Sequence, residues 1–376
     1  MMLYEINRDI EMDKPEHIEN EIPFPLLRDR IKNPYELFQN LQNYIPNISD
    51  KAVNYKYILW KNKKNYQVKY KKTQYVSILN YRDDYFKIDR LVDYFNEIPR
   101  MKAKRRDKNC SPLEAWQNME ILKPWINNKM KNNETFSIID LREQIWRLGL
   151  ECNAFKASLA KSIYDIFKPN TILDFSAGWG DRLLGAIAYG ANRYLGYDPN
   201  PELQNGYREM IEMFATNPSK KYEVIMEPFE TAEITEKFDL VLTSPPYYDF
   251  ETYISSEHQN AKTQSIHRYP QFADWMVNFL CKSLYKCWNA LNPGGNMVIH
   301  LSDVYRTNYV ESMILFILGW CKGARFDGSI ASIGDCGKPR PLWIFHKTGQ
   351  TYIQASAREN MKIYYMELYR AILYTV

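Results

Sequence analysis

Short apolar runs alternate with longer stretches of helical spacing along the second half of the chain. The apolar runs have the length of buried strands, and the stretches between them place apolar residues three and four positions apart, as on one face of a helix. The predicted elements are strand 171–175, helix 180–189, strand 193–197, helix 201–214, strand 222–226, strand 238–243, helix 271–291, strand 296–301, helix 309–321 and strands near 324–331 and 341–346. Such alternation predicts an α/β fold with a doubly wound, mostly parallel sheet that carries helices on both faces.

The pattern before residue 170 is different. From Lys51 to Arg82, aromatic residues alternate in part with lysines, which is typical of a β-ribbon or a short sheet. Ser111-Pro-Leu-Glu114 has the spacing of a capping box with proline at the first helical position, and it predicts a helix start. Further helices are predicted from Pro34 to about Tyr44 and over 140–167, with a candidate break near Gly149.

The end of the chain has an apolar stripe that is typical of an amphipathic helix packed on the α/β body. The stripe lies within 352–376 and consists of Met361, Tyr365, Leu368 and Ile372. We therefore expect three parts in the chain. They are a basic and aromatic N-terminal α+β region over 1–135, an α/β domain over 136–348 and a C-terminal helix over 349–376.

Composition places the chain among globular proteins. Of its 376 residues, 45% are hydrophobic and 25% are charged, which excludes disordered, collagen-like and disulfide-scaffold classes. The chain has no run of about eighteen uncharged apolar residues and no charged-then-apolar leader. We therefore expect a soluble intracellular protein, cytoplasmic or at the nucleoid or nucleus, without a membrane span. Because the six cysteines form no C-x-x-C pair and the histidines lack ligand spacing, we expect neither a disulfide framework nor a metal site.

Positive charge is concentrated in one segment. Residues 51–110 hold 17 Lys and Arg against 6 Asp and Glu, whereas the whole chain carries a net charge of +4. A basic segment with interleaved aromatic side chains is typical of a nucleic-acid-binding surface, for which the candidate contacts are Lys63, Lys64, Arg105 and Arg106. Codon bias in an AT-rich genome is the competing explanation for the many Lys, Asn and Tyr residues. Such a bias would act along the whole chain, so we favour nucleic acid as the partner.

The strand at 171–175 ends in a glycine turn, Asp174-Phe-Ser-Ala-Gly178-Trp-Gly180, which a predicted helix follows. A doubly wound sheet binds adenosine-bearing cofactors at such a turn. The dinucleotide pattern G-x-G-x-x-G fails because Leu183 stands where its third glycine would be, and no P-loop motif follows any strand. An acid at the strand end before G-x-G instead suits S-adenosylmethionine, which has an amino-acid tail and no pyrophosphate.

Three residues suit this ligand in different ways. Gly178 lets the backbone approach the ligand closely, and the Asp174 carboxylate can orient the loop or accept a hydrogen bond from the ammonium group of the tail. Asp198 ends the next strand, where a carboxylate can bind both ribose hydroxyls. Taken alone, this motif is also compatible with a structural glycine turn in another α/β protein.

A second motif, Ser244-Pro-Pro-Tyr247, directly follows the strand 238–243. Its two prolines remove backbone donors and fix the backbone at this point. The carbonyls of Ser244 and Pro245, with the Ser244 hydroxyl, can form a rigid set of acceptors for an amino group, and Tyr247 can stack on a planar base. Holding both protons of an aromatic amine helps its nitrogen to attack an electrophilic methyl group.

Together the two motifs resemble the class I S-adenosylmethionine-dependent amino-methyltransferases, a family with a [D/N/S]-P-P-[Y/F/W] motif that includes DNA N4-cytosine and N6-adenine methyltransferases. The resemblance covers roughly residues 150–347 and includes Leu291-Asn-Pro-Gly-Gly295. It implies a Rossmann-like sheet of seven strands with an antiparallel last strand near Pro341 to Phe345. The catalytic residues that it implies are Ser244, Pro245, Pro246 and Tyr247. The cofactor-binding residues that it implies are Asp174, Ser176, Ala177, Gly178, Gly180, Asp198 and Phe229.

The expected reaction is direct methyl transfer to the exocyclic amine of cytosine or adenine in DNA, on a base flipped out of the helix. No cysteine follows a proline at this strand end, so covalent attack on a ring carbon is not expected. The loop 248–270 can close over the base, with Tyr248 and Phe250 as candidate contacts. In the resembling family, serine at the first motif position is commoner among cytosine enzymes. Adenine stays open as the target, as do an RNA substrate and a catalytically silent partner subunit.

Overall fold

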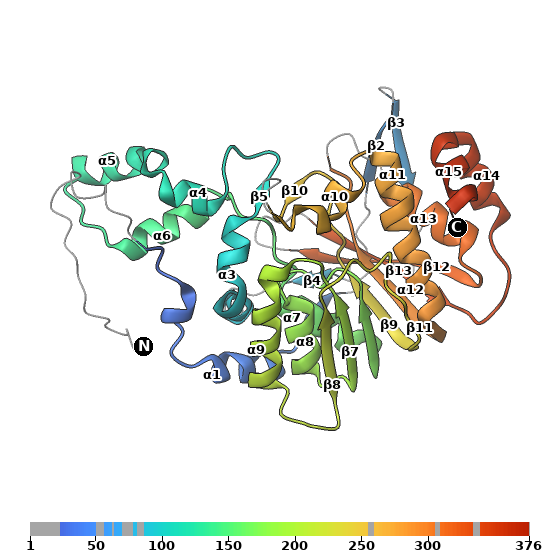
Figure 1. Cartoon of the computed structure of the whole chain (residues 1–376), viewed down its shortest axis with the longest axis horizontal. Helices are drawn as coiled ribbons and strands as arrows, with labels where there is room; N and C mark the ends of the chain where they lie inside the picture. Colours follow the sequence, from blue (N-terminus) through green and yellow to red (C-terminus); the bar gives the residue numbers. More distant parts are fainter. Residues whose placement is uncertain are drawn as a thin grey trace.

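The structure is a computed structural model, and it describes residues 23–49, 56–61, 64–69, 78–80, 86–254, 259–304, 309–333 and 339–375. A nine-stranded sheet forms its centre, with helices on both faces (Figure 1). From edge to edge the strands run in the order β1-β4-β12-β13-β11-β9-β6-β7-β8. The α/β fold class predicted from the alternating pattern is confirmed.

Seven of these strands make up the sheet that the resemblance implied. They are β6 (Thr171–Asp174), β7 (Arg193–Tyr197), β8 (Lys221–Ile225), β9 (Phe238–Thr243), β11 (Leu291–His300), β12 (Ala324–Ile333) and β13 (Pro339–Lys347). β6 pairs in parallel with β7 and β9, and the parallel pairing continues from β7 to β8 and from β9 to β11. β13 runs antiparallel to both β11 and β12. The antiparallel last strand expected near Pro341 to Phe345 lies within β13.

Two short strands from the N-terminal part extend this sheet, which the sequence patterns did not predict. β4 (Ile78–Asn80) pairs in parallel with β12, and β1 (Asn47–Ser49) pairs antiparallel with β4. The N-terminal part is therefore built into the central sheet. The division of the chain at residue 135 stays a prediction.

The core has two layers because successive side chains of a strand point to opposite faces of the sheet. In β9, the buried Leu240 and Leu242 pack on one face and the buried Val241 packs on the other. The helices of the first layer are α7 (Ala157–Phe167), α8 (Asp181–Tyr189) and α9 (Gln204–Phe214), and those of the second layer include α12 (Lys282–Ala290) and α13 (Tyr309–Trp320).

Helices that precede residue 135 share the first layer. They are α1 (Pro34–Gln42), α2 (Phe86–Asp89) and α3 (Asp93–Lys102). Phe38 of α1 and Leu91, just after α2, are buried in the same core as α7 and α8. Farther out, α4 (Pro112–Gln117), α5 (Lys123–Lys131) and α6 (Ile138–Arg147) surround a small cluster of their own around Trp116 and Ile145, at one end of the molecule (Figure 1).

Two local predictions in this part of the chain are confirmed. The Ser111 hydroxyl accepts from the backbone N–H of Glu114 at 3.2 Å, and the Glu114 carboxylate accepts from the backbone N–H of Ser111 at 2.7 Å, which completes the capping box. The basic ribbon is a hairpin of β2 (Lys56–Lys61) and β3 (Lys64–Lys69) in antiparallel register. The helical run over 140–167 is two helices, α6 and α7, and the break begins near Gly149.

The single C-terminal helix predicted over 349–376 is wrong. The structure has two helices, α14 (Ala355–Tyr364) and α15 (Met366–Thr375), with a non-helical backbone at Tyr365 (φ −138°). Met361 and Ile372 are both buried, although they lie on different helices. The bend places α14 against α13 and α15 against the segment Trp275–Cys281, so the apolar faces of both helices reach the body.

The helix predicted over 271–291 is a continuous helical run of three types. α11 (Phe272–Asp274) leads into a π-helix (Trp275–Cys281), and α12 completes the run. Within the described ranges, no helix combines the length and apolar character needed to cross a bilayer.

Candidate active site

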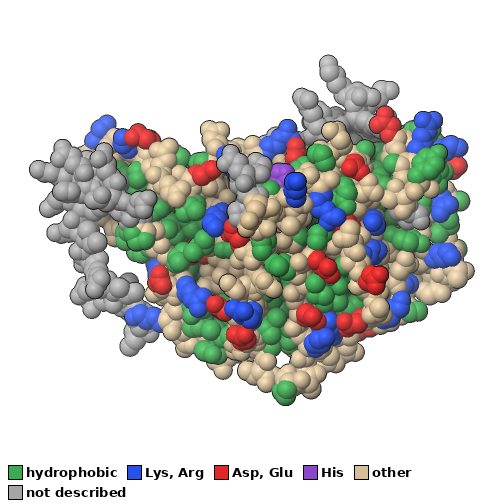
Figure 2. Space-filling model, viewed as in Figure 1, with side chains coloured by type: hydrophobic (Ala, Val, Ile, Leu, Met, Phe, Trp, Pro, Cys, Tyr) green, Lys and Arg blue, Asp and Glu red, His purple; other side chains and the backbone are tan. Residues whose placement is uncertain are grey.

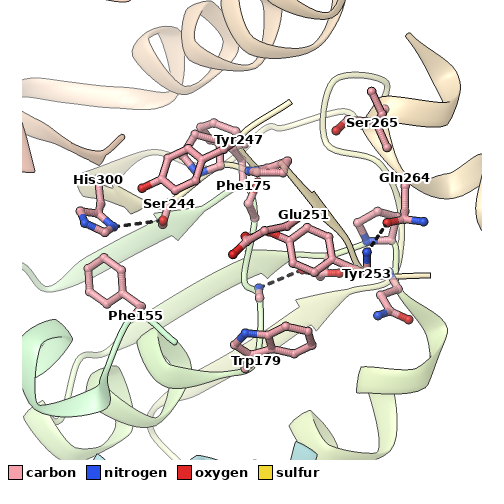
Figure 3. Close-up of a pocket in the computed structure, with 18 of the residues that line it drawn as sticks. Phe155, Phe175, Trp179, Ser244, Tyr247, Glu251, Tyr253, Gln264, Ser265 and His300 are labelled. Atoms are coloured by element: carbon pink, nitrogen blue, oxygen red, sulfur yellow. Dashed lines mark hydrogen bonds between the residues drawn. The ribbon is translucent and has the colours of Figure 1, made fainter. Parts of the chain in front are cut away.

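A cavity of about 390 Å³ lies at the carboxyl ends of β6, β7, β9 and β11. Parallel strands gather their carboxyl ends at one edge of the sheet, and the loops that follow them form ligand pockets in doubly wound folds. Both sequence motifs contribute to its wall (Figure 3). The cavity is therefore the candidate active site.

The glycine loop after β6 forms one side of the cavity. Ser176, Gly178 and Trp179 line it, and Gly178 has a left-handed backbone (φ +62°) that favours glycine. Ala177 and Gly180 are not among the lining residues. The Ala177 N–H donates to the Tyr197 carbonyl at 2.8 Å, so this residue holds the loop onto β7.

Asp174 lies behind the loop and does not line the cavity. Its fully buried carboxylate accepts from the Arg182 guanidinium at 2.7 Å, the Tyr194 hydroxyl at 2.8 Å and the Ser176 N–H at 3.2 Å. With these partners the carboxylate orients the loop. Arg182 also donates to the Ser176 carbonyl, which joins the start of α8 to the same turn.

Asp198, at the end of β7, does face the cavity. Its two carboxylate oxygens accept from the backbone N–H groups of Gly178 at 2.8 Å and Asn200 at 3.0 Å. Burial raises the pKa of this carboxyl to about 6, against the lowering effect of these hydrogen bonds. The carboxylate is thus fixed in place, and its remaining lone pairs can accept from the hydroxyl groups of a ligand.

An aromatic wall closes the cavity beside Asp198. Phe229 lines it and also belongs to the core, where its ring stacks on Phe175 at 5.5 Å and meets the edge of Tyr197 at 5.0 Å. The next residue, Glu230, lines the cavity too and forms an ion pair with Arg268 at 3.0 Å. Phe175 and Phe229 give this part of the cavity an aromatic surface.

All four residues of the Ser244–Tyr247 motif line the opposite side of the cavity. The Ser244 hydroxyl oxygen lies 3.3 Å from Nδ1 of His300. The Tyr247 hydroxyl also hydrogen bonds with the Ser244 side chain, and burial raises the pKa of this phenol. The motif is therefore a rigid wall that carries backbone carbonyls and one hydroxyl.

The loop after the motif covers the cavity. Tyr248 has a left-handed backbone (φ +49°) and its hydroxyl donates to the Pro270 carbonyl at 2.5 Å. Phe250 lines the cavity, as do Glu251 and Tyr253, whose hydroxyl donates to the Glu251 carboxylate at 2.6 Å. Burial raises the pKa of Glu251 above its ordinary value.

The structure describes the side chains of two of the four basic candidates, Arg105 and Arg106. Lys63 falls outside the described residues, and Lys64 is the first residue of β3, with no side chain described. Arg105 lies in β5 (Lys104–Arg105), and its guanidinium lies 5.3 Å from the Phe250 ring centre while it pairs with Asp107 at 2.7 Å. Arg106 forms an ion pair with Asp249. Both arginines thus border the loop over the cavity.

Charge is mixed over the visible face of the molecule. Figure 2 shows Lys and Arg side chains interspersed with Asp and Glu over this face. Most lysines of the basic segment fall between 51 and 87, where no side chains are described. Within the described ranges, no group of three His, Cys, Asp or Glu side chains is placed to hold a metal ion.

Sequence reasoning missed several residues of the site. His300 is the last residue of β11, and Ser244 directly follows β9. An inspection of the polar residue at the end of every predicted strand would therefore have found His300. Phe155 falls within the helical run predicted over 140–167, but it precedes α7 and lines the cavity. Glu251 and Arg340 also line it, and no local pattern marks them.

No protein-family model and no curated protein matches this chain. Several solved structures resemble part of it at low sequence identity. TrmN from Thermus thermophilus is 14% identical over 51% of this chain and 48% of TrmN, with a TM-score of 0.36. An rRNA methylase from Streptococcus thermophilus is 9% identical over 52% of this chain and 98% of its own, with a TM-score of 0.33.

A third structure, a Streptococcus mutans protein in complex with SAH, is 16% identical over 47% of this chain and 88% of its own, with a TM-score of 0.32. This chain thus matches about half of the length of TrmN. These likenesses concern the α/β fold alone.

Proposed function

We propose that this chain is an S-adenosylmethionine-dependent methyltransferase that methylates the exocyclic amine of a base, cytosine N4 or adenine N6, in DNA. The observation that carries the proposal is the single cavity that the glycine loop and the Ser244–Tyr247 motif share. Direct methyl transfer requires that one cavity holds both the cofactor and the amine, with hydrogen-bond acceptors for the amine.

The residues around the glycine loop fit the cofactor. Asp198 is held by two backbone N–H groups and can accept from both ribose hydroxyls, and the ring of Phe229 offers an apolar surface to the adenine. Gly178 lines the cavity without a side chain, so the amino-acid tail can lie close to the loop backbone. When bound, the cofactor supplies an electrophilic methyl group on its sulfonium sulfur.

The Ser244–Tyr247 motif fits the amine. The two prolines fix the carbonyls of Ser244 and Pro245, and the Ser244 hydroxyl lies beside them. Hydrogen bonds from both amine protons to these acceptors would hold the amine and raise the electron density on its nitrogen. Tyr247 and Phe250 supply aromatic surface in the same cavity for a base that has left the helix.

A nucleic-acid substrate is supported by the charge of residues 51–110, which hold 17 Lys and Arg against 6 Asp and Glu. Arg105 and Arg106 from this segment lie beside the loop that covers the cavity. RNA has the same phosphate charge, so the test must offer DNA and RNA side by side.

The test is to incubate the full chain with methyl-labelled cofactor and, separately, duplex DNA, single-stranded DNA and RNA. Digestion and mass spectrometry then identify the methylated nucleoside. Methylcytosine or methyladenine in DNA supports the proposal. Label in RNA alone would replace DNA by RNA as the substrate. No label in any pool, despite cofactor binding measured by calorimetry, would indicate a catalytically silent partner subunit.

Two variants control this experiment. The double variant Ser244→Ala with Tyr247→Ala removes the side-chain contacts to the amine and base, and it should lose label while it still binds the cofactor. Ser283→Ala is the matched control, because Ser283 is a fully buried serine of α12 that does not line the cavity. It should methylate at the wild-type rate.

A further inference from the structure

His300 and Ser244 occupy neighbouring strand ends. β11 and β9 are parallel with Ile299 opposite Thr243, so the residue that ends β11 meets the residue that follows β9. The contact is made between Nδ1 of His300 and the Ser244 hydroxyl, which are 3.3 Å apart (Figure 3). The parallel register of β11 with β9, and not a flexible loop, therefore places His300 against the Ser244 hydroxyl, which is the proposed acceptor for the amine.

The imidazole is neutral and held in one orientation. Burial, together with the positive charges of Arg340 and Arg182, lowers the pKa of His300 to about 3. The Phe155 ring packs against it edge to face, with ring centres 5.4 Å apart and an interplanar angle of 87°. A neutral imidazole has one N–H donor and one nitrogen acceptor, so its two nitrogens have different roles.

The second nitrogen, Nε2, is available to a ligand. His300 lines the cavity, and within the described part of the chain Nε2 makes no hydrogen bond. If Nε2 carries the proton, Nδ1 must accept from the Ser244 hydroxyl. The hydroxyl proton is then committed to His300, so the Tyr247 hydroxyl donates to the Ser244 oxygen, and the second lone pair of that oxygen is left to accept from the target amine.

We propose that His300 donates from Nε2 to the ring nitrogen next to the target amino group, so that the site selects an amidine edge. This inference rests on the proposed function. In cytosine the edge is N3 beside the N4 amine, and in adenine it is N1 beside the N6 amine. Both present an acceptor next to a donor, which complements the His300 N–H beside the Ser244 oxygen.

The same arrangement disfavours other amine edges. The Watson–Crick edge of guanine carries an N–H at N1 beside its N2 amine, so the two donors of that edge would face the His300 donor. A side-chain amide has no ring nitrogen beside its amine. Sites built to pair a polar group discriminate strongly against ligands that leave this group unpaired.

The first test pairs an altered base with an altered side chain. Oligonucleotides that carry 3-deazacytosine or 1-deazaadenine lack the ring nitrogen, and the wild-type protein should methylate them about 10- to 100-fold less efficiently in kcat/KM. His300→Phe should be slow on the normal base and should show little further loss on the deaza base. Removal of the ring nitrogen also changes the reactivity of the amine itself. This change is the same for wild type and His300→Phe, so it cancels when the normal-to-deaza ratios of kcat/KM of the two proteins are compared.

Two further variants separate positioning from folding. His300→Gln carries an amide N–H that can reach the same region of the cavity, so it should recover part of the discrimination that His300→Phe loses. The melting temperature of each variant shows whether it is folded. If wild type and His300→Phe show the same ratio of kcat/KM between normal and deaza bases, the inference fails while the proposed function stands. If the wild-type protein methylates neither cytosine nor adenine, the proposed function itself fails.

The second test does not depend on activity. ¹⁵N NMR of the histidine-labelled protein should show His300 as the neutral tautomer with hydrogen on Nε2, with no titration between pH 5 and 8. Its Nε2 signal should shift when an oligonucleotide with the normal base binds in the presence of S-adenosylhomocysteine, and it should shift less with the deaza base. Hydrogen on Nδ1 in the complex would overturn the inference.

Discussion

The backbone N–H of Arg106 donates to the carbonyl of Phe250 at 2.8 Å. This bond extends the pairing of β5 with β10 (Glu251–Thr252), in which Arg105 is opposite Glu251. The basic segment of the N-terminal part is thereby joined to the loop directly after the Ser244–Tyr247 motif. A substrate that moves the basic segment would also move a wall of the cavity.

The ion pair between Arg106 and Asp249 predicts opposite effects of two substitutions. Arg106 has a side chain that is 63% exposed, and Asp249 neutralises part of its charge. Arg106→Gln should weaken nucleic-acid binding about 3-fold and lower the salt slope by about one. Asp249→Asn should strengthen binding by a similar factor because it frees the guanidinium for a phosphate. Fluorescence anisotropy over a series of salt concentrations measures both.

Arg208→Gln is the control for this pair, because Arg208 is an exposed arginine of α9 that does not line the cavity. Its affinity for nucleic acid should equal that of the wild-type protein. Equal affinities for Arg106→Gln, Asp249→Asn and wild type would show that the surface around Arg106 does not contact the nucleic acid.

The close approach of α3 and α9 supports the glycine loop. The Asn96 amide donates to the carbonyl of Trp179 at 2.8 Å, and a Cβ on Gly206 would lie 2.0 Å from the Asn96 side-chain oxygen. Gly206→Ala should therefore displace Asn96, lower the free energy of unfolding by about 1–3 kcal/mol and weaken cofactor binding. Urea unfolding and calorimetry measure the two effects.

Asn96→Ala provides the background that checks this mechanism. Once Asn96 is removed, alanine at Gly206 meets no obstacle from it and has the better helix propensity. Gly206→Ala should then be neutral or stabilising in the Asn96→Ala background. If Gly206→Ala lowers stability as much in the Asn96→Ala background as in the wild-type background, the steric clash of the new methyl group is with a residue other than Asn96.

Cofactor binding should depend on pH through Asp198, whose pKa burial raises to about 6. The ionised carboxylate is the better acceptor for ribose hydroxyls, so affinity should be constant above pH 7 and fall up to about tenfold per pH unit below pH 6. Asp181 also lines the cavity, and burial raises its pKa to about 7, so a variant must separate the two groups. Asp198→Asn should bind the cofactor more weakly at pH 8 and lose the fall below pH 6. If the fall persists in this variant, another group causes it.

Asp181 should also control stability in the absence of cofactor. Burial first, and then the charge of Asp89, raises its pKa from 3.8 to about 7. The folded state therefore binds its proton more tightly than the unfolded state, and this group's contribution to stability is lost as pH rises from about 4 to 7. Asp181→Asn keeps an oxygen for the Lys156 N–H, which lies 3.1 Å from the carboxylate. It should be more stable than wild type by about 2 kcal/mol at pH 8, and by much less at pH 5.

Urea unfolding at the two pH values checks this prediction, with the exposed Asp29 as control. The difference between Asp29→Asn and wild type should be the same at pH 5 and pH 8. A pH-independent effect of Asp181→Asn would mean that its carboxyl is not protonated in the folded state near neutral pH.

Local patterns predicted the strands and helices of the α/β part well, because burial on both faces of a parallel sheet leaves a continuous apolar run in each strand. The Ser244–Tyr247 motif could be recognised in the sequence for the same reason, because it directly follows the apolar run of β9. The bend at Tyr365 was not predicted, because the apolar stripe of the C-terminal segment has the same spacing in one helix or two. The short strands β1 and β4 have three residues each, too few for a periodic signal.

By itself, the sequence determined the order of strands and helices, the glycine turn after β6 and the rigid motif after β9, since each depends on residues close together in the chain. Only the tertiary structure decided which distant residues meet. His300 lies 56 positions from Ser244, and the parallel register of β11 with β9 brings them together. Arg106 reaches Phe250 because β5 pairs with β10. Such pairings depend on the packing of the whole chain, which local periodicity does not encode.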